Sequence, residues 1–87
     1  MKAKDYGLSK QDIMEMSDQY LLDIGYHFPI VVEEGNGMYL RDAEGKEYLD
    51  FYAGIAVNSA GNCNERIVKA VQEQVAQVMH VSLYPYN

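Results

Sequence analysis

Apolar residues recur at helical spacing in two stretches of this sequence, one toward each end. In the first stretch they fall at positions i, i+3, i+7 and i+8, namely Ile13, Met16, Tyr20 and Leu21. Ser9 precedes this pattern and Asp12 follows Ser9 by three residues, an arrangement that resembles a capping box. We therefore predict a helix over about residues 10–22 that ends before Gly25.

The second stretch carries one apolar stripe, formed by Ile67, Ala70, Val71, Val75, Val78 and Met79. Asn64 stands before it in the position of an N-cap residue, whose side chain accepts from the first free amides of a helix. Glu65 follows, and its negative charge suits the positive end of the helix dipole. This pattern predicts an amphipathic helix over about residues 65–79.

Between these helices, apolar and polar residues alternate with a period of two. The first run is β-branched and is followed by Gly35-Asn36-Gly37, which supplies the positive φ angles that favour a chain reversal. The second and third runs, residues 38–41 and 47–51, flank a turn at residues 42–46. The pattern predicts a three-stranded antiparallel meander over about residues 30–51, with one face packed and the other facing solvent or a partner.

A small-residue loop joins the meander to the second helix. Residues 54–61 are rich in Gly, Ala, Ser and Asn, which allow the backbone to approach another group closely. The predicted fold class is α+β, with an N-terminal helix, a three-stranded antiparallel meander, this loop and a long amphipathic helix in that order.

Length, composition and charge narrow the class of protein. A chain of 87 residues is shorter than an ordinary domain of roughly 100–200 residues, so we expect one small domain or a piece of a larger protein. Its 48% hydrophobic content is too high for a disordered segment. A net charge of -6 with scattered basic residues argues against a nucleic-acid partner. A single cysteine and the lack of a signal-peptide or membrane-spanning run indicate the cytoplasm and no membrane.

Candidate reactive side chains are few. His27, His80 and Cys63 do not follow any metal-ligand spacing, so no metal site is predicted, and structural roles are favoured for all three. The aromatic run Tyr84-Pro85-Tyr86 fits a buried interface in a parent protein better than a recognition motif. We interpret the end of the chain as interrupted rather than finished.

Three blocks of sequence, residues 35–42, 44–51 and 53–58, carry a resemblance to a known family. Together with the helix that follows and the final His80, Ser82 and residues 84–87, they resemble the opening of class III aminotransferases of fold type I. This group contains the acetylornithine, ornithine and 4-aminobutyrate aminotransferases. The resemblance extends from about Pro29 to Asn87, in order and with uniform spacing.

The sequence also departs from the family pattern. Where the family usually has Gly-His-x-His-Pro, this chain has residues 61–65, Gly-Asn-Cys-Asn-Glu. Asn62, at the second position of that run, is still able to cap a helix. Many members have a Tyr four residues before the proline, where this chain has Gly25, with Tyr26 one position away. These departures leave the subfamily open.

The resemblance implies a homodimeric enzyme that uses pyridoxal phosphate. Such an enzyme transfers an amino group between an amine or amino acid, of the ornithine, acetylornithine or 4-aminobutyrate type, and a 2-oxo acid. In the family, the Schiff-base lysine, the acid beside the pyridine nitrogen and the phosphate ligands lie downstream of the stretch matched here. The resemblance therefore implies no catalytic and no cofactor-binding residue in this chain, and no cofactor for the chain alone.

The part of the site that the resemblance does assign to this chain is a loop near the substrate entrance. It consists of Gly54, Ile55, Ala56 and Val57, and Ile55 is the candidate for an apolar wall contact. Two hypotheses follow. In the first, residues 1–87 are a single N-terminal segment of an aminotransferase whose partners are the remainder of that enzyme, a second subunit and its small-molecule substrates. In the second, the chain is a stand-alone interaction protein, derived from that block, that dimerises to cover its apolar surface.

Overall fold

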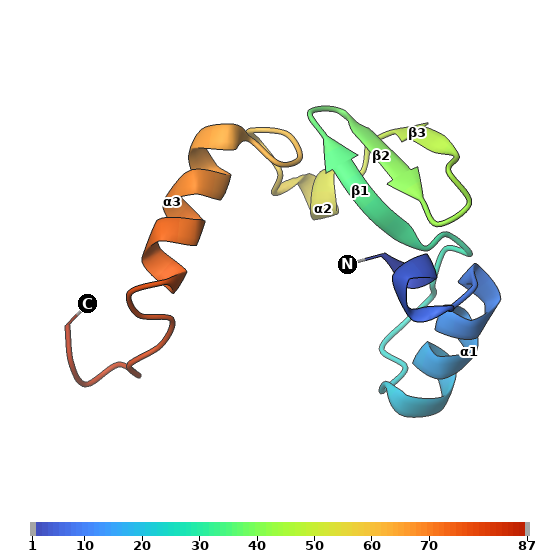
Figure 1. Ribbon diagram of the computed structural model, residues 1–87, viewed down its shortest axis with the longest axis horizontal. Helices are drawn as coiled ribbons and strands as arrows, with labels where there is room; N and C mark the ends of the chain where they lie inside the picture. The colour runs from blue at the N-terminus through green and yellow to red at the C-terminus, as the bar shows by residue number, and fades with distance from the viewer. Residues whose placement is uncertain (1, 87) are drawn as a thin grey trace.

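The computed structural model describes residues 2–86, and its elements follow the predicted order (Figure 1). A short 3-10 helix η1 and the first α-helix precede the strands, and two further helical segments follow them. Their bounds are η1 Ala3–Tyr6, α1 Lys10–Tyr20, β1 Val32–Asn36, β2 Tyr39–Asp42, β3 Glu47–Leu49, α2 Ala53–Ala56 and α3 Glu65–Val75. The predicted α+β arrangement of helix, three-stranded antiparallel sheet and helix is confirmed.

Helix α1 begins where the sequence predicts and ends slightly earlier. The Ser9 hydroxyl accepts from the Asp12 backbone N–H at 3.1 Å, and the Asp12 carboxylate accepts from the Ser9 N–H at 2.7 Å. The capping box is therefore complete. The Ser9 hydroxyl also donates to the Asp12 carboxylate at 2.6 Å, and this bond, followed by that from the Ser9 backbone N–H, lowers the pKa of Asp12. Leu21 is extended, with φ -102° and ψ 148°, so the helix stops at Tyr20.

Helix α3 is capped by Asn64, whose Oδ1 accepts from the backbone N–H groups of Arg66 at 3.1 Å and Ile67 at 3.4 Å. It ends at Val75, short of the predicted residue 79. Beyond its end, the Gln74 side chain donates to the Val78 carbonyl at 3.1 Å and fixes a turn there. The apolar spacing continues through this turn, so spacing alone placed the end of the helix too late.

The three strands form one antiparallel sheet in the order β1-β2-β3. Gly35 pairs with Leu40, and Leu40 pairs with Tyr48, which places these three residues on one face. Glu34, Arg41 and Glu47 pair in the same way and lie on the other face. A bulge between Val32 and Glu34 shifts the register of β1 at its start. The two faces of the sheet therefore differ in polarity at these positions.

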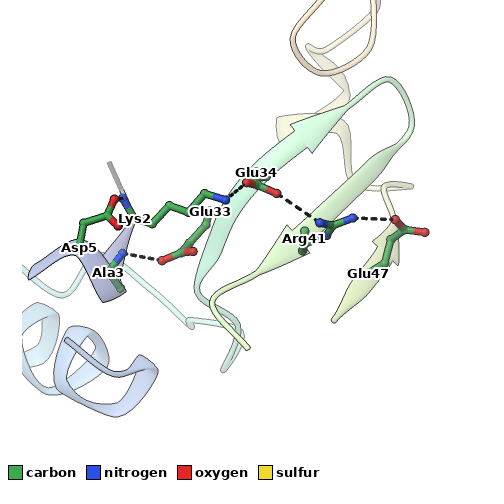
Figure 2. A network of polar contacts seen from close by, with 7 residues as sticks. All are labelled: Lys2, Ala3, Asp5, Glu33, Glu34, Arg41 and Glu47. Carbon is green, nitrogen blue, oxygen red and sulfur yellow. Dashed lines mark hydrogen bonds and ion pairs between the residues drawn. The ribbon is translucent and has the colours of Figure 1, made fainter. Parts of the chain in front are cut away.

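A row of charges on the second face connects the sheet to the N-terminal region (Figure 2). Lys2 forms an ion pair with Glu34, which also lies 3.6 Å from an Arg41 nitrogen, and Arg41 reaches Glu47 at 3.8 Å. The hydrogen bond with Glu34 raises the pKa of Lys2 and lowers that of Glu34. The Ala3 backbone N–H adds a hydrogen bond of 2.7 Å to Glu33. Because the ion pairs are solvent-exposed, each stabilises this attachment weakly.

The apolar faces of the chain are not fully covered. Within residues 2–86 no hydrophobic side chain is fully buried, and Asp42, at 3% exposure, is the one buried polar residue. Helix α3 stands apart from the sheet (Figure 1), and Val71 on its apolar side is 59% exposed. Leu49 in the sheet is 48% exposed. The predicted packed face is therefore only partly covered in this chain by itself: Leu40 and Tyr48 on that face are half-buried, and Asn62 lies against Gly35.

The helices of this chain are short, and α1 and α3 have 11 residues each. No helix within residues 2–86 combines the length and the apolar character that crossing a bilayer requires.

Candidate functional site

The segment α2 is a left-handed turn. Ala53, Gly54, Ile55 and Ala56 all have positive φ, at 49°, 60°, 66° and 60°. The Ala56 N–H donates to the Tyr52 carbonyl at 3.0 Å, so one helical turn closes with the opposite hand to an ordinary α-helix. For residues other than glycine this conformation costs roughly 1–2 kcal/mol each. Consecutive strained residues of this kind occur chiefly at functional sites.

Asp50 holds the start of this turn. Its Oδ1 accepts from the Ala53 backbone N–H at 2.7 Å, and its Oδ2 accepts from the Asn62 side-chain amide at 2.9 Å. The hydrogen bond from Asn62, followed by that from Ala53, lowers the pKa of Asp50. Asp50 is therefore ionised at neutral pH and connects the turn to a residue further along the chain.

Asn62 joins this region to the β1–β2 hairpin. Its backbone exchanges two hydrogen bonds with Gly37, of 2.8 and 2.9 Å, and its side-chain nitrogen lies 3.2 Å from the Gly37 carbonyl oxygen. Its side-chain oxygen accepts from the Asn58 amide at 3.0 Å. The sequence also allowed Asn62 to cap the second helix, but Asn64 caps α3 instead. Sequence reasoning missed the connecting role because Gly37 and Asp50 are distant along the chain.

Two glycines make this close approach possible. A Cβ atom on Gly61, which has φ +77°, would lie 3.1 Å from the Gly37 carbonyl oxygen. A Cβ atom on Gly35 would lie 2.8 Å from the Cβ of Asn62. The expectation that residues 54–61 allow close backbone approach is confirmed at Gly61.

An open cleft of about 680 Å³ lies beside the left-handed turn. Three aromatic rings contact one another at its wall: Tyr26 and Phe28 have centroids 5.8 Å apart, and Phe28 and Tyr52 are 6.2 Å apart, both edge to face. Asp50, Asn58, Asn62 and Gly54 add a polar side. The cleft therefore combines an apolar wall with convergent polar groups, as small-molecule sites do.

The sequence-predicted site residues all lie on or directly after this turn. Gly54 lines the cleft. The side chains of Ile55 and Val57 are both 72% exposed, and Ala56 is exposed as well. Tyr26, which the sequence placed one position away from a family tyrosine, also lines the cleft. The structure brings these residues to one end of the sheet.

The lysines of the chain lie elsewhere. All five are within residues 2–86, and none lines the cleft. Three are paired with carboxylates: Lys2 with Glu34, Lys10 with Glu44 at 3.2 Å and Lys69 with Glu73 at 3.9 Å. Lys46 lies over the Tyr48 ring, 4.8 Å from its centroid, and Lys4 is exposed in η1. A Schiff-base lysine is typically desolvated in an apolar pocket, and none of these five lysines is buried.

The remaining reactive side chains are dispersed. His27 lines the cleft, whereas Cys63 is exposed in the loop before α3 with φ 55°. Between residues 2 and 86, no three His, Cys, Asp or Glu side chains come together in a way that could hold a metal ion. Tyr84, in the aromatic run, is 95% exposed.

Comparison with known proteins gives a consistent result. Residues 22–87 match the family described as "Aminotransferase class-III". The acetylornithine aminotransferase of Clostridium acetobutylicum is 46% identical over 72 residues, which are 83% of this chain and 19% of that protein. The acetylornithine aminotransferase of Methanocaldococcus jannaschii is 39% identical over 80 residues, 92% of this chain and 20% of that protein. The chain thus spans about a fifth of the length of these relatives.

Solved structures agree with the sequence relatives. The acetylornithine aminotransferase from Elizabethkingia anophelis superposes with a TM-score of 0.81 at 27% identity, over 90% of this chain and 20% of that one. The ornithine aminotransferase from Toxoplasma gondii, whose active site is partially occupied by pyridoxal phosphate, superposes with a TM-score of 0.80 at 27% identity. The match covers 98% of this chain and 21% of that one. The fold of this chain matches the N-terminal part of the fold of these pyridoxal phosphate enzymes.

Proposed function

This chain belongs to the class III aminotransferase family, and from that premise we propose that it forms one wall of the substrate entrance in a pyridoxal-phosphate-dependent aminotransferase. The reaction is amino transfer between an amine or amino acid, of the ornithine, acetylornithine or 4-aminobutyrate type, and a 2-oxo acid. Gly54, Ile55, Ala56 and Val57 form the wall. The observation that carries this proposal is the left-handed turn at Ala53–Ala56 beside an aromatic cleft.

The chemistry of the turn supports a binding role rather than a catalytic one. Its four residues have no side chain that can exchange a proton or attack a substrate. Ile55 presents an apolar side chain that is 72% exposed, suited to contact with the methylene groups of an aliphatic amine. The strain of the turn fixes the direction in which this side chain projects. The chain therefore orients substrate and excludes water from one side of it.

The cofactor is proposed to be held by the remainder of the aminotransferase. Pyridoxal phosphate supplies an electron sink for bonds at the amine carbon. The residues present here do not fit its binding site, because the lysines are exposed or ion-paired and lie away from the cleft. We assign the Schiff-base lysine, the phosphate ligands and the second subunit of a homodimer to partner segments. The single cysteine supports a cytoplasmic location for the assembly.

The proposal is tested with a chimera in which this chain replaces the matching stretch of the Clostridium acetobutylicum acetylornithine aminotransferase. We expect a folded protein that binds pyridoxal phosphate and transfers the amino group of acetylornithine to a 2-oxo acid. Ile55→Asp should raise KM for the amino donor at least about tenfold, because a charge replaces an apolar contact. Ile55→Leu, the matched control, should remain within about twofold.

Cofactor absorbance and circular dichroism show whether the chimera is correctly assembled. A folded, cofactor-loaded chimera without amino transfer would contradict the proposed function. Equal KM values for the Ile55→Asp and Ile55→Leu chimeras would remove Ile55 from the substrate wall.

A second candidate function, a stand-alone dimerising protein, is favoured by the uncovered apolar side of α3. Ile67, Val71 and Val75 on this side are 52%, 59% and 46% exposed. If two copies pair through it, sedimentation of the 87-residue chain will show a dimer that Val71→Asp converts to monomer. Gln72→Asp is the control on the same helix. A wild-type monomer throughout the micromolar range would exclude this function.

A further inference from the structure

We propose that Asn62 is a positioning residue, which sets the orientation of the left-handed turn Ala53–Ala56 through its contacts with Asp50 and Asn58. This inference rests on the proposed function of the turn as a substrate wall. It adds Asn62, which lies outside the four wall residues and on the polar side of the cleft.

The argument begins with a closed ring of hydrogen bonds. The Asn62 side-chain amide donates to Asp50 Oδ2 at 2.9 Å, and Asp50 Oδ1 accepts from the Ala53 N–H at 2.7 Å. The Ala53 carbonyl accepts from the Asn58 N–H at 3.0 Å, and the Asn58 side-chain amide donates to Asn62 Oδ1 at 3.0 Å. The ring thus starts and ends at Asn62. It holds both backbone polar groups of Ala53, the first residue of the strained turn.

Two members of the ring are fixed to the sheet: Asp50, which follows β3 and whose backbone N–H donates to the Met38 carbonyl at 2.7 Å, and Asn62. The Asn62 backbone N–H and C=O both bond to Gly37, in the turn between β1 and β2, at 2.8 and 2.9 Å. Asn62 packs against Gly35 so closely that a Cβ atom added to Gly35 would lie 2.8 Å from the Cβ of Asn62. The hairpin therefore determines where the Asn62 side chain lies, and the ring transfers that position to the turn.

The ring requires an amide at position 62. Asn62 donates to a carboxylate with its nitrogen and accepts from Asn58 with its oxygen, so both ends of the amide are used. Asn62→Asp keeps the shape and the acceptor but places two carboxylates side by side, which repel one another. Asp50→Asn removes the acceptor instead and leaves two side-chain amide nitrogens facing one another.

The double variant, which combines Asp50→Asn with Asn62→Asp, reverses the direction of the bond between positions 50 and 62. The amide introduced at position 50 can donate to the carboxylate introduced at position 62, while its oxygen still accepts from the Ala53 N–H. That carboxylate still accepts from Asn58. Its second oxygen, however, replaces the nitrogen that lies 3.2 Å from the Gly37 carbonyl oxygen, so a weak hydrogen bond there becomes a repulsive contact. If position 62 required asparagine for stability alone, the double variant would not recover. If the ring of hydrogen bonds is what matters, the double variant should recover.

The test uses these variants in the aminotransferase chimera, with Asn36→Asp as control for the same chemical change at an exposed position in β1. We expect each single variant to raise KM for acetylornithine about tenfold, with kcat within about twofold, because substrate positioning and not the chemical step is affected. The double variant should recover to within about threefold of the parent, as coupled residues do. Hydrogen exchange at the Ala56 and Val57 amides should accelerate in the single variants and slow again in the double variant.

Two results would overturn the positioning role. One is unchanged exchange and KM in Asn62→Asp, and the other is a double variant whose defects are the product of the two single defects. A fall in kcat or in cofactor content with KM unchanged would also contradict it. If the parent chimera does not catalyse transfer, the proposed function fails, and exchange at Ala56 and Val57 still decides whether Asn62 orients the turn.

Discussion

Gly61→Ala will detach the loop before α3 from the β1–β2 hairpin. Gly61 has φ +77°, where a side chain costs roughly 1–2 kcal/mol. The new Cβ would also lie 3.1 Å from the carbonyl oxygen and 3.3 Å from the Cα of Gly37, both backbone atoms that cannot rotate away. Overlap of this kind adds about 1–3 kcal/mol. Hydrogen exchange at the Gly37 and Asn62 amides, which bond to one another's carbonyls, measures the loss directly.

Gly45→Ala separates the cost of a side chain at positive φ from the cost of the overlap with Gly37. Gly45 has φ +84°, close to that of Gly61, but a Cβ there would meet nothing within 4 Å. It should therefore show the conformational cost alone, and its free energy of local opening should change less than that of Gly61→Ala. Equal effects of the two substitutions would mean that the contact with Gly37 is not tight.

Asp42→Asn will disorder the β2–β3 turn and loosen the pairing of β3. The Asp42 carboxylate is 3% exposed and accepts three hydrogen bonds: from the Lys46 N–H at 2.8 Å, the Glu44 N–H at 3.0 Å and the Tyr48 hydroxyl at 2.8 Å. An amide accepts through its oxygen alone and carries no charge, so at position 42 it cannot keep all three of these part-buried hydrogen bonds at full strength. We expect exchange at the Glu44 and Lys46 amides to accelerate at least about tenfold.

Because the pKa of Asp42 is shifted, we expect the stability of the β2–β3 turn to depend on pH. Burial by itself would raise the pKa of Asp42, but the hydrogen bonds from Tyr48, Lys46 and Glu44, with the charge of Lys10, lower it below the ordinary 3.8. A carboxyl group with a lower pKa in the folded state stabilises the fold above its unfolded pKa. That contribution is lost as pH falls through the folded pKa. The turn should therefore be fully formed at neutral pH and open below about pH 4.

Comparison of the parent with Asp42→Asn isolates this contribution, because Asp12 and Asp50 also have lowered pKa values and contribute to acid unfolding of both proteins. The difference in exchange at Lys46 between the two should shrink as pH falls below about 4. Asp18→Asn, an exposed acid on α1, is the control and should change neither the rate nor its pH dependence. A difference that stays constant down to acid pH would contradict the role of the charge.

Much of the fold could be predicted because its signals are local. Ser9 and Asp12 lie within one helical turn and form the capping box that their spacing indicates. Asn64 caps α3 in the same way. The turn between β1 and β2 contains Gly37 at φ +58°, as the glycines of that segment suggest. In each case the residues that determine the conformation are neighbours in sequence.

The candidate site was only partly predictable. The four residues proposed as a substrate wall, Gly54 to Val57, were predicted through the family resemblance, and the left-handed conformation of Gly54, Ile55 and Ala56 was not. Ala53, Ile55 and Ala56 are not residues that favour positive φ, so no local propensity indicates this conformation. Asp50 and Asn62 were likewise not recognised, because they act across 12 residues of chain.

The sequence by itself determined the order of the elements, their caps and turns, and membership of the aminotransferase family. These depend on hydrogen bonds and steric preferences that act over a few residues, and on a pattern of residues that can be compared directly. The tertiary structure decided which residues share a face of the sheet, since pairing Leu40 with Tyr48 depends on strand register. It also decided that Ala53–Ala56 wind to the left, because hydrogen bonds with Asp50 and Asn58, linked to each other through Asn62, hold Ala53 in a conformation that the local sequence disfavours.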